Sequence, residues 1–320
     1  MREQKYGAKA VAGLAALGTL ALNETDDILA PDRLIERARD CAIIVSDRLT
    51  PAPAHLFQGL PRLIALVRNA MDIRNIDVPA ASASGVLVTR AGPGFIPAVV
   101  ELLLGQMVDL ARGTSDYVAA YRAGRIPEQR LGIQLAGKTA GVIGYGNLGR
   151  RMADVLAFLG MRVLVHDPYA KTAAAAVLLV DLDRLLGEAD FVLCLAVHSK
   201  ETEGMLNAGF FRRMKPTAFL INPSRGPVLI EDDLVAALRE KRIAGAALDV
   251  GNEPDDIPPV KLGRLANVIA APHIGGMVPD SMESQAQDTV DQVRQILAGE
   301  MPKFAVNPTE ARRFKTSARA

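Results

Sequence analysis

A glycine loop between a strand-like segment and a helix-like segment is the strongest constraint on the fold of this chain. The loop, Gly144–Gly149, has the pattern G-x-G-x-x-G, follows the apolar run Thr139–Ile143 and leads into a helical segment over Leu148–Leu159. A strand, such a loop and a helix in this order form the turn that holds the pyrophosphate of a dinucleotide. The pattern alone is common in glycine-rich chains, so its context carries the prediction.

Each glycine of the loop has a separate task in such a turn. Gly144 permits the tight turn, Gly146 lets the backbone approach a phosphate, and Gly149 lets the helix pack closely on the strand. The next predicted strand, Arg162–His166, ends at Asp167, at the expected spacing of about 20 residues. A carboxylate there accepts ribose hydroxyls and repels a 2′-phosphate, which favours NAD over NADP. The alternative is that Asp167 is a plain turn residue.

Short apolar runs alternate with helical segments along almost the whole chain, which indicates an α/β fold. From residue 135 onward six runs are nearly all apolar, as parallel strands covered on both faces must be. With helices between them they predict a doubly wound, Rossmann-type parallel sheet. These strands are Thr139–Ile143, Arg162–His166, Phe191–Leu195, Ala218–Asn222, Ala246–Val250 and Val268–Ala270.

The first hundred residues predict a second, smaller α/β unit. Its strand candidates are Ala42–Ser46, Leu63–Val67 and Val86–Val88, and the run Ala10–Leu22 is expected to be a helix followed by a strand. A glycine- and proline-rich connection over 91–94 then leads into a long helix from Pro97. We therefore expect two Rossmann-like domains with doubly wound parallel sheets. A dinucleotide domain, 97–276, is inserted into a substrate domain made of 1–96 and 277–320.

Composition excludes several classes of function. The net charge is +1 and 49% of the 320 residues are apolar, so there is no field to capture nucleic acid and no stretch long enough to span a membrane. The two cysteines, Cys41 and Cys194, lack metal-ligand spacing and the density of a disulfide scaffold. We expect reduced thiols, no metal and a cytoplasmic location.

Three charged side chains follow predicted strands of the same sheet, where α/β sites assemble. His273 could move the hydroxyl proton during hydride transfer, Glu253 could hydrogen-bond its imidazole and fix the tautomer, and Arg225 could anchor a carboxylate. Each residue alone fits a structural role equally well. Of the other histidines, His55 is expected at the surface and His198 near the cleft.

Together these segments resemble the signatures of the D-isomer-specific 2-hydroxyacid dehydrogenases. The resemblance covers nearly the whole chain and implies Arg225 as substrate anchor, His273 as acid and base, and Glu253 as its partner. It implies an NAD-dependent reaction on a small D-2-hydroxy or 2-oxo acid, and a homodimer packed through the dinucleotide domain. Beyond the glycine loop, cofactor contacts are implied at Asn147, Leu148, Asp167, Pro223, Ser224, Arg225, Asp249, His273, Gly275 and Gly276.

The predicted substrate loop departs from the family. Where relatives carry a glycine-rich turn whose N–H groups bind the substrate carboxylate, this chain has Asn69, Ala70, Met71 and Asp72. Asp72 replaces a glycine, and two interpretations stay open. It either repels the substrate carboxylate or bends the loop, or it is a local partner for a nearby arginine.

Two other functions are compatible with these residues. A relative that oxidises another small anion, such as phosphite, shares the Arg–Glu–His set, whereas formate dehydrogenases carry glutamine at the position of Glu253. The same fold also serves as a dinucleotide-sensing transcriptional corepressor, because fold does not fix function.

Overall fold

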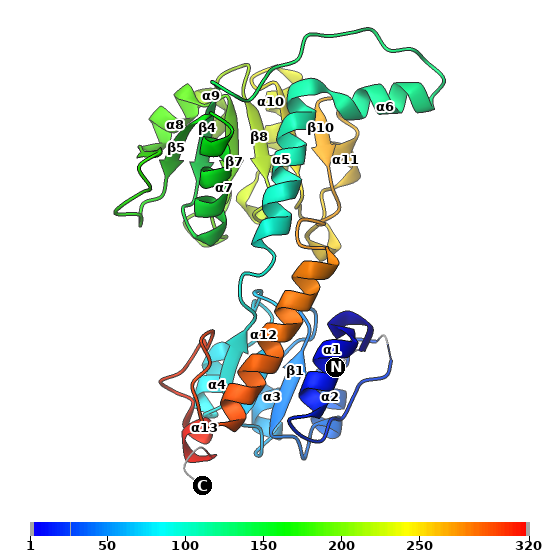
Figure 1. The fold of residues 1–320 in the computed structure, drawn as a ribbon, viewed down its shortest axis with the longest axis vertical. Helices are drawn as coiled ribbons and strands as arrows, with labels where there is room; N and C mark the ends of the chain where they lie inside the picture. The colour runs from blue at the N-terminus through cyan, green and yellow to red at the C-terminus, as the bar shows by residue number, and fades with distance from the viewer. Residues whose placement is uncertain (1–2, 26, 318–320) are drawn as a thin grey trace. The chain divides into compact units, whose positions relative to one another are not determined.

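The computed structural model describes residues 3–25 and 27–317 of the chain. These divide into two compact units, one formed by Met1–Phe95 with Val278–Ala320 and the other by Ile96–Met277. The chain therefore leaves the first unit after residue 95 and returns to it at residue 278. Figure 1 shows both units.

The second unit contains a seven-stranded, fully parallel sheet in the order β10-β9-β8-β7-β4-β5-β6. The chain builds outward from β4 in one direction and then returns to build outward from β7 in the other. The connections after β4 and β7 therefore run in opposite directions across the sheet. The boundary between these two strands is the switch point, where α/β proteins bind ligands. The strands are β4 (Thr139–Ile143), β5 (Arg162–His166), β6 (Val177–Leu179), β7 (Phe191–Cys194), β8 (Phe219–Asn222), β9 (Gly245–Leu248) and β10 (Val268–Ala270).

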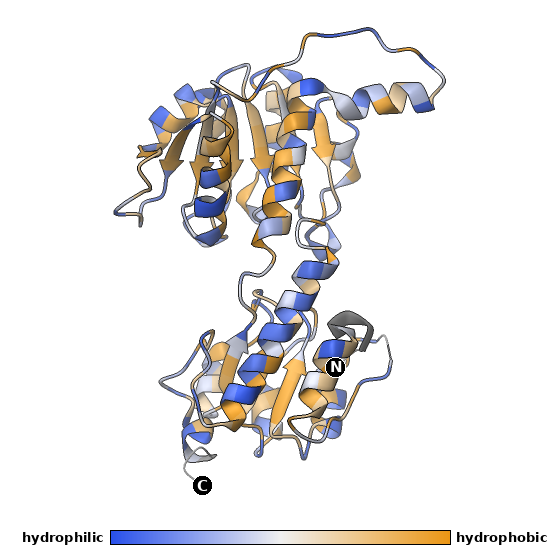
Figure 2. Cartoon of the chain, viewed as in Figure 1, coloured by the Kyte–Doolittle hydropathy of each residue, from blue (hydrophilic) through white to orange (hydrophobic). Residues whose placement is uncertain are grey.

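Helices cover both faces of this sheet, which is why its central strands are buried and apolar (Figure 2). On one face α5 (Ile96–Arg112) packs on α7 (Asn147–Phe158), β8 and β9. The opposite face carries α8 (Leu182–Glu188), α9 (Ala208–Arg213) and α10 (Glu231–Arg239) over one apolar core. The remaining elements are α6 (Thr114–Arg122), the short helices η1 (Gly226–Val228) and η2 (Pro254–Asp256), and α11 (Val260–Gly263).

Local chemistry explains where several of these helices begin. Asp181 accepts the backbone N–H of Arg184 at the start of α8, and Asn207 accepts that of Phe210 at the start of α9. Both are N-caps that satisfy a donor which the helix itself leaves unpaired. By contrast the N-cap of α7 is Gly146, which has no side chain that could accept a hydrogen bond from the helix.

The first unit has a three-stranded parallel sheet in the order β1-β2-β3. Its strands are β1 (Ile43–Ser46), β2 (Ala65–Arg68) and β3 (Leu87–Arg90). The helix α12 (Pro279–Leu297) packs against α1 (Glu3–Ala15) and β2. A Cβ on Gly13 would lie only 3.0 Å from Val290 of α12, so that glycine permits the close packing of these two helices. The smaller helices are α2 (Pro31–Arg37), α3 (Ala54–Gly59), α4 (Val78–Ala83) and α13 (Arg312–Ser317).

The predicted fold class, two α/β units with parallel sheets, is confirmed. Local predictions fail in three places. The strand expected near residue 22 does not form, because residues 16–22 are turn and irregular chain. The sequence prediction missed the strand β6 and the helix α6. Both missed elements are short, and β6 pairs at the sheet edge with only one neighbour.

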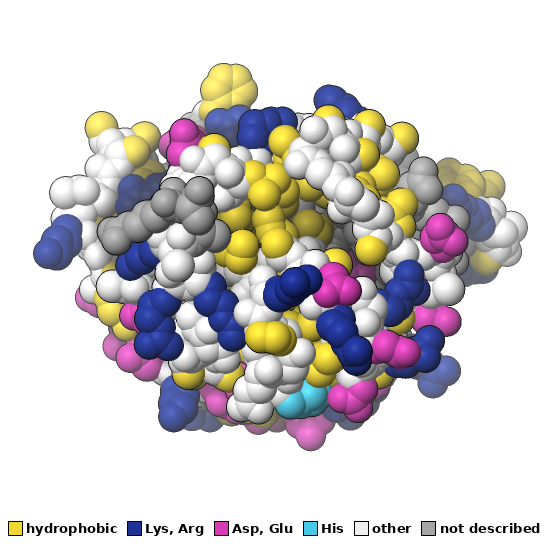
Figure 3. Space-filling view, turned by 90° about the horizontal axis from the view of Figure 1, so that it is seen from below, with side chains coloured by type: hydrophobic (Ala, Val, Ile, Leu, Met, Phe, Trp, Pro, Cys, Tyr) yellow, Lys and Arg dark blue, Asp and Glu magenta, His cyan; other side chains and the backbone are white. Residues whose placement is uncertain are grey.

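On the face in Figure 3, lysine and arginine side chains lie among acidic and apolar ones rather than in one basic patch. Over residues 3–25 and 27–317, each helix is either too short or too polar to cross a bilayer. In the same residues no group of three or more His, Cys, Asp or Glu side chains is arranged to hold a metal ion.

Candidate active site

The geometry of the glycine loop agrees with the predicted tasks of Gly144 and Gly149. Gly144 has φ of 96°, in the region that favours glycine. A Cβ on Gly149 would lie 2.0 Å from the carbonyl oxygen of Gly144, so the helix can start only if that residue has no side chain. Gly146 differs, because a Cβ there would meet no protein atom within 4 Å. The protein's own packing therefore does not require a glycine at 146.

Asp167 lies directly after β5 and fixes the loop after β4. Its carboxylate accepts the backbone N–H of Tyr145 at 2.7 Å and that of Tyr169 at 2.8 Å. Each carboxylate oxygen keeps further lone pairs, so two hydroxyl groups of a ribose can still donate to it. The two interpretations of Asp167, as a turn residue and as a ribose ligand, are thus compatible.

The loops after β8, β9 and β10 are joined to one another. A Cβ on Gly226 would lie 2.1 Å from the carbonyl oxygen of Gly251, so the loops after β8 and β9 are in backbone contact. Asp249, after β9, accepts the backbone N–H groups of Ile274 and Gly275 at 2.9 Å each. These contacts bring the Asn222–Gly226, Asp249–Glu253 and Pro272–Gly276 segments to one edge of the sheet.

Asp249 is 3% exposed, and this burial raises the pKa of its carboxyl above the usual value. The two N–H groups that it accepts and the nearby imidazole of His273 oppose that shift. In the ionised state its two short hydrogen bonds hold the turn that carries His273. The resemblance implied a cofactor contact at Asp249, and its present partners are backbone groups of the protein.

The predicted pairing of His273 with Glu253 is not what the structure shows. Nδ1 of His273 lies 2.9 Å from the backbone carbonyl oxygen of Asp255. The exposed Glu253 instead forms a backbone bridge with Ile257, and the described residues show no hydrogen bond from its side chain. The segment turns sharply, with φ of 65° at Asp255 and 59° at Asp256, and so presents a carbonyl to the imidazole.

A carbonyl oxygen only accepts hydrogen bonds, so it requires a proton on Nδ1 of His273. In the neutral imidazole Nε2 is then the basic nitrogen. In this structure the carbonyl of Asp255 thus favours the tautomer that Glu253 was expected to select. His273 itself has φ of 55°, a strained value for a residue other than glycine, and such strain is concentrated at functional sites.

The segment after β8 presents unpaired polar atoms. Asn222 is fully buried, its side-chain oxygen accepts the N–H of Ser224, and its Nδ2 has no partner among the described atoms. The buried Oγ of Ser224 lies near the thiol of Cys194, where it slightly opposes the burial that raises the pKa of that thiol, and has no other partner among the described atoms. The half-buried Arg225 donates to the carbonyl of Ser224 at 2.7 Å. Sequence reasoning placed Asn222 in this segment but did not single it out.

The predicted substrate loop lies in the first unit, directly after β2. Arg74 donates to the carboxylate of Asp72 through its backbone, its Nε and its terminal nitrogen, at 2.7–3.0 Å. The side chain of Asp72 is only 11% exposed and that of Arg74 is 50% exposed. Of the two interpretations of Asp72, the local arginine partner is therefore confirmed, and the pair cancels the charge that would oppose an acid.

The fully buried Arg68 organises the turn from which this loop starts. It donates to the backbone carbonyls of Asp47 and Thr50 and to the side chain of Asn75. These bonds tie the loop after β1 to the loop after β2. Arginine side chains are mostly solvated, so the sequence favours an exposed Arg68, whereas the structure buries it completely.

The other histidines are not part of this arrangement. His55 is half exposed and lies 3.5 Å from Asp32, as a surface residue would. His198 is exposed after β7, and Nδ1 of His166 contacts the carbonyl oxygen of Val180 at 3.1 Å.

The residues present fit a dinucleotide at the switch point. The open space at Gly146 and the uncapped N–H groups at the start of α7 suit a pyrophosphate. Asp167 suits a ribose, and the unpaired Nδ2 of Asn222 and Oγ of Ser224 suit the polar groups of a ligand at the end of β8. Fold and site together define a dinucleotide-binding α/β protein.

Comparisons with known proteins identify its family. Residues 104–275 match the model of the D-isomer specific 2-hydroxyacid dehydrogenase, NAD binding domain. The chain is 33% identical over 300 residues to D-3-phosphoglycerate dehydrogenase of Synechocystis sp., covering 92% of this chain and 54% of that protein. It is 32% identical over 282 residues to glyoxylate reductase of Korarchaeum cryptofilum, covering 86% of this chain and 85% of the relative.

A solved structure from Thermus thermophilus superimposes with a TM-score of 0.85 at 28% identity, over 93% of this chain and 96% of that one. The chain therefore belongs to the D-isomer specific 2-hydroxyacid dehydrogenase family, and its cofactor is NAD. It spans about half the length of its phosphoglycerate dehydrogenase relatives, covering 54% of the proteins from Synechocystis sp. and Methanocaldococcus jannaschii.

Proposed function

We propose that this protein transfers a hydride between NAD(H) and a small D-2-hydroxy or 2-oxo acid. The observation that carries the proposal is the contact between Nδ1 of His273 and the Asp255 carbonyl at 2.9 Å. This contact selects the tautomer whose Nε2 can take a hydroxyl proton, on a turn of the NAD-binding domain.

The proposed roles follow from where each group is held. In oxidation, neutral His273 accepts the hydroxyl proton of the substrate at Nε2, and in reduction the imidazolium returns it to the carbonyl oxygen. Arg225 binds the substrate carboxylate with its planar fork of donors. NAD supplies the hydride acceptor when bound, and Asp249 keeps the turn of His273 in place through Ile274 and Gly275.

The first test is NADH oxidation by the purified protein against a panel of 2-oxo acids. The panel includes glyoxylate, hydroxypyruvate and branched and aromatic acids, with phosphite and NAD as a separate arm. We expect turnover with at least one 2-oxo acid. Tight NADH binding without turnover on any acid would contradict the proposal and favour a dinucleotide sensor, and turnover with phosphite alone would favour oxidation of an inorganic anion.

The second test addresses the acid and base. His273→Ala is expected to lower kcat by about 10²–10⁴-fold, while NADH affinity measured by fluorescence stays near the wild-type value. Glu253→Gln is the matched control, because the described residues show no hydrogen bond between the side chain of Glu253 and His273. An effect of the control equal to that of His273→Ala would refute the tautomer argument.

The third test addresses the ribose. Asp167→Asn keeps the shape of the side chain and removes the charge that would repel a 2′-phosphate. We expect the preference for NADH over NADPH in binding to fall by about tenfold, which is a change of roughly 1.4 kcal/mol. An unchanged preference would remove Asp167 from this role.

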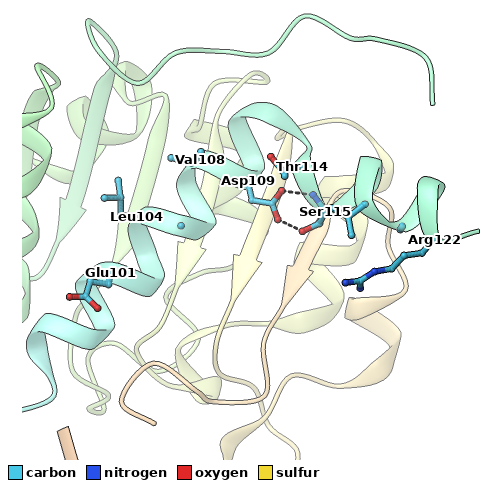
Figure 4. Close-up of a pocket in the computed structure, with 10 residues that line it drawn as sticks. Glu101, Leu104, Val108, Asp109, Thr114, Ser115 and Arg122 are labelled. Atoms are coloured by element: carbon cyan, nitrogen blue, oxygen red, sulfur yellow. Dashed lines mark hydrogen bonds between the residues drawn. The ribbon is translucent and has the colours of Figure 1, made fainter. Parts of the chain in front are cut away.

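We also propose a homodimer formed through α5, α6 and the segment 123–136 of the dinucleotide domain. The residues of this region that leave apolar surface exposed are Val108, Val118, Tyr121, Ile126 and Leu131. Figure 4 shows the pocket between α5 and α6, where the carboxylate of Asp109 accepts both the N–H and the hydroxyl of Ser115. Exposed apolar side chains gathered in one region favour a protein partner. We take that partner to be a second copy of this chain, because the family resemblance implies a homodimer.

Light scattering after size exclusion tests the dimer. Leu131→Asp, which charges a fully exposed apolar position on this surface, is expected to halve the measured mass. Phe158→Asp on α7 is the control, because Phe158 is 89% exposed but lies outside the surface described. Equal masses for wild type and both variants would contradict the proposed interface.

A further inference from the structure

One face of α12 carries a stripe of polar side chains that is unusual for a helix packed on a core. Gln285, Asp288, Thr289 and Gln292 lie at helical spacing of three and four residues, and the last two are buried. The buried apolar residues of α12, such as Val290 and Val293, instead pack in the core of the first unit. A buried polar stripe is costly unless it is hydrogen-bonded, so its partners indicate its purpose.

The first partners lie at the end of β3 and on the connection that follows it. Asp288 accepts the backbone N–H of Gly92 at 2.9 Å, and Nε2 of Gln292 donates to the carbonyl of Arg90 at 3.0 Å. A Cβ on Gly92 would lie 2.6 Å from the carboxylate of Asp288, and one on Gly94 would lie 2.2 Å from the hydroxyl of Ser284. The glycines of residues 91–94 thus allow the connection to run directly against α12.

The next partner lies at the start of the substrate loop. The fully buried hydroxyl of Thr289 shares its single proton between two acceptors, Oδ1 of Asn69 at 3.1 Å and the carbonyl oxygen of Gln285 at 3.0 Å. Asn69 follows β2 directly, and its own N–H donates to Ser46 at 2.9 Å. One turn of α12 therefore holds both the connection and the first residue of the loop.

A second buried threonine, Thr89, provides a comparison for Thr289. Thr89, on β3, is also fully buried, yet its hydroxyl has no partner among the described atoms. A buried hydroxyl without a partner contributes nothing that valine would not, whereas the hydroxyl of Thr289 joins two segments. The contrast identifies the Thr289–Asn69 contact as a specific link.

We propose that Thr289 is a positioning residue that fixes Asn69, and with it the substrate loop, on the same helix face where Asp288 holds the connection between the units. The inference rests on the proposed function, because it assigns the loop to binding of the acid. Asp288 faces the N–H of Gly92 together with the charges of Asp291 and Lys303. One oxygen of its carboxylate thus binds the connection. Thr289 is the residue that contacts the predicted substrate loop, through Asn69.

The experiment compares Thr289→Val with Thr289→Ser and with the control Thr89→Val in the full-length protein. Thr289→Val is expected to raise KM for the best 2-oxo acid roughly five- to tenfold, the effect of one lost hydrogen bond, with kcat and NADH affinity near wild type. Thr289→Ser keeps the hydroxyl and is expected to restore KM. The control removes an unpartnered hydroxyl and is expected to leave KM unchanged.

Hydrogen exchange supplies a second measurement that needs no turnover. Thr289→Val is expected to speed amide exchange in residues 69–77 relative to wild type, and Thr89→Val is not. Equal exchange in all three proteins would refute the inference even if the enzyme is active, and so would a KM shift shared by Thr89→Val. Faster exchange in an enzyme that turns over no acid would leave the positioning role standing and refute the proposed function instead.

Discussion

Substitution of Gly146 can show whether the glycine is needed for cofactor binding or for folding, because the protein leaves open space around it. Gly146→Ala adds a methyl group that meets no protein atom within 4 Å, and the residue has φ of −74°, which alanine adopts without strain. Replacing glycine restricts the unfolded chain and stabilises by about 0.4–1 kcal/mol. Alanine at an N-cap costs a similar amount relative to glycine, so the free energy of unfolding should change by less than about 1 kcal/mol.

Cofactor binding should respond very differently. If Gly146 lets the backbone approach the pyrophosphate, a methyl group there displaces it from the N–H groups at the start of α7. Losing one or two hydrogen bonds to a charged group costs about 1.5–3 kcal/mol each, and one alone lowers affinity by roughly 10–150-fold. The same substitution should thus leave the free energy of unfolding nearly unchanged and strongly weaken the binding of NADH.

Urea unfolding of the apoprotein and NADH fluorescence titration measure the two quantities. Gly187→Ala, in α8, is the matched control, because a Cβ there also meets nothing within 4 Å and should change neither NADH binding nor packing. Gly149→Ala is the opposite control, because its Cβ would overlap the Gly144 carbonyl at 2.0 Å and should destabilise the apoprotein by several kcal/mol, beyond the usual ~1–3. Wild-type NADH affinity in Gly146→Ala would refute the assignment of the loop.

Three further predictions concern groups that are buried or partly buried. Asp249→Asn places an amide donor against the Gly275 N–H and is expected to lower the unfolding free energy by about 1–3 kcal/mol and to reduce kcat, as urea unfolding and steady-state kinetics would show; unchanged values would refute its role in holding the turn. Burial favours protonation of Asp190, but the Thr139 N–H and Lys215 outweigh it and lower its pKa, so its stabilisation is present above the unfolded pKa and is lost as pH falls through the folded one. Asp190→Asn should therefore cost about 1–2 kcal/mol at neutral pH and little in acid, and a constant difference across pH would contradict this. Burial raises the pKa of Cys194 to about 11, so this thiol should resist a thiol-specific reagent at mildly alkaline pH until the protein is unfolded, and labelling in the native state would contradict its burial.

Features that depend on neighbours in the sequence were predictable. The glycine loop, the strand before it, the helix after it and the carboxylate at Asp167 are set by local spacing, and the structure places them as expected. The alternation of apolar runs likewise predicted a parallel sheet covered on both faces, because only buried strands can be apolar on both sides. The family follows from the same segments.

Features that depend on contacts between distant residues were decided by the tertiary structure. The partner of His273 is a backbone carbonyl, which no side-chain pattern encodes, and a sharp turn at Asp255 and Asp256 places it there. The charge of Asp72 is cancelled by an arginine two residues away, a pairing that the sequence allowed but did not require. Backbone groups and side-chain orientations are positioned by packing, and the sequence shows only which residues are available.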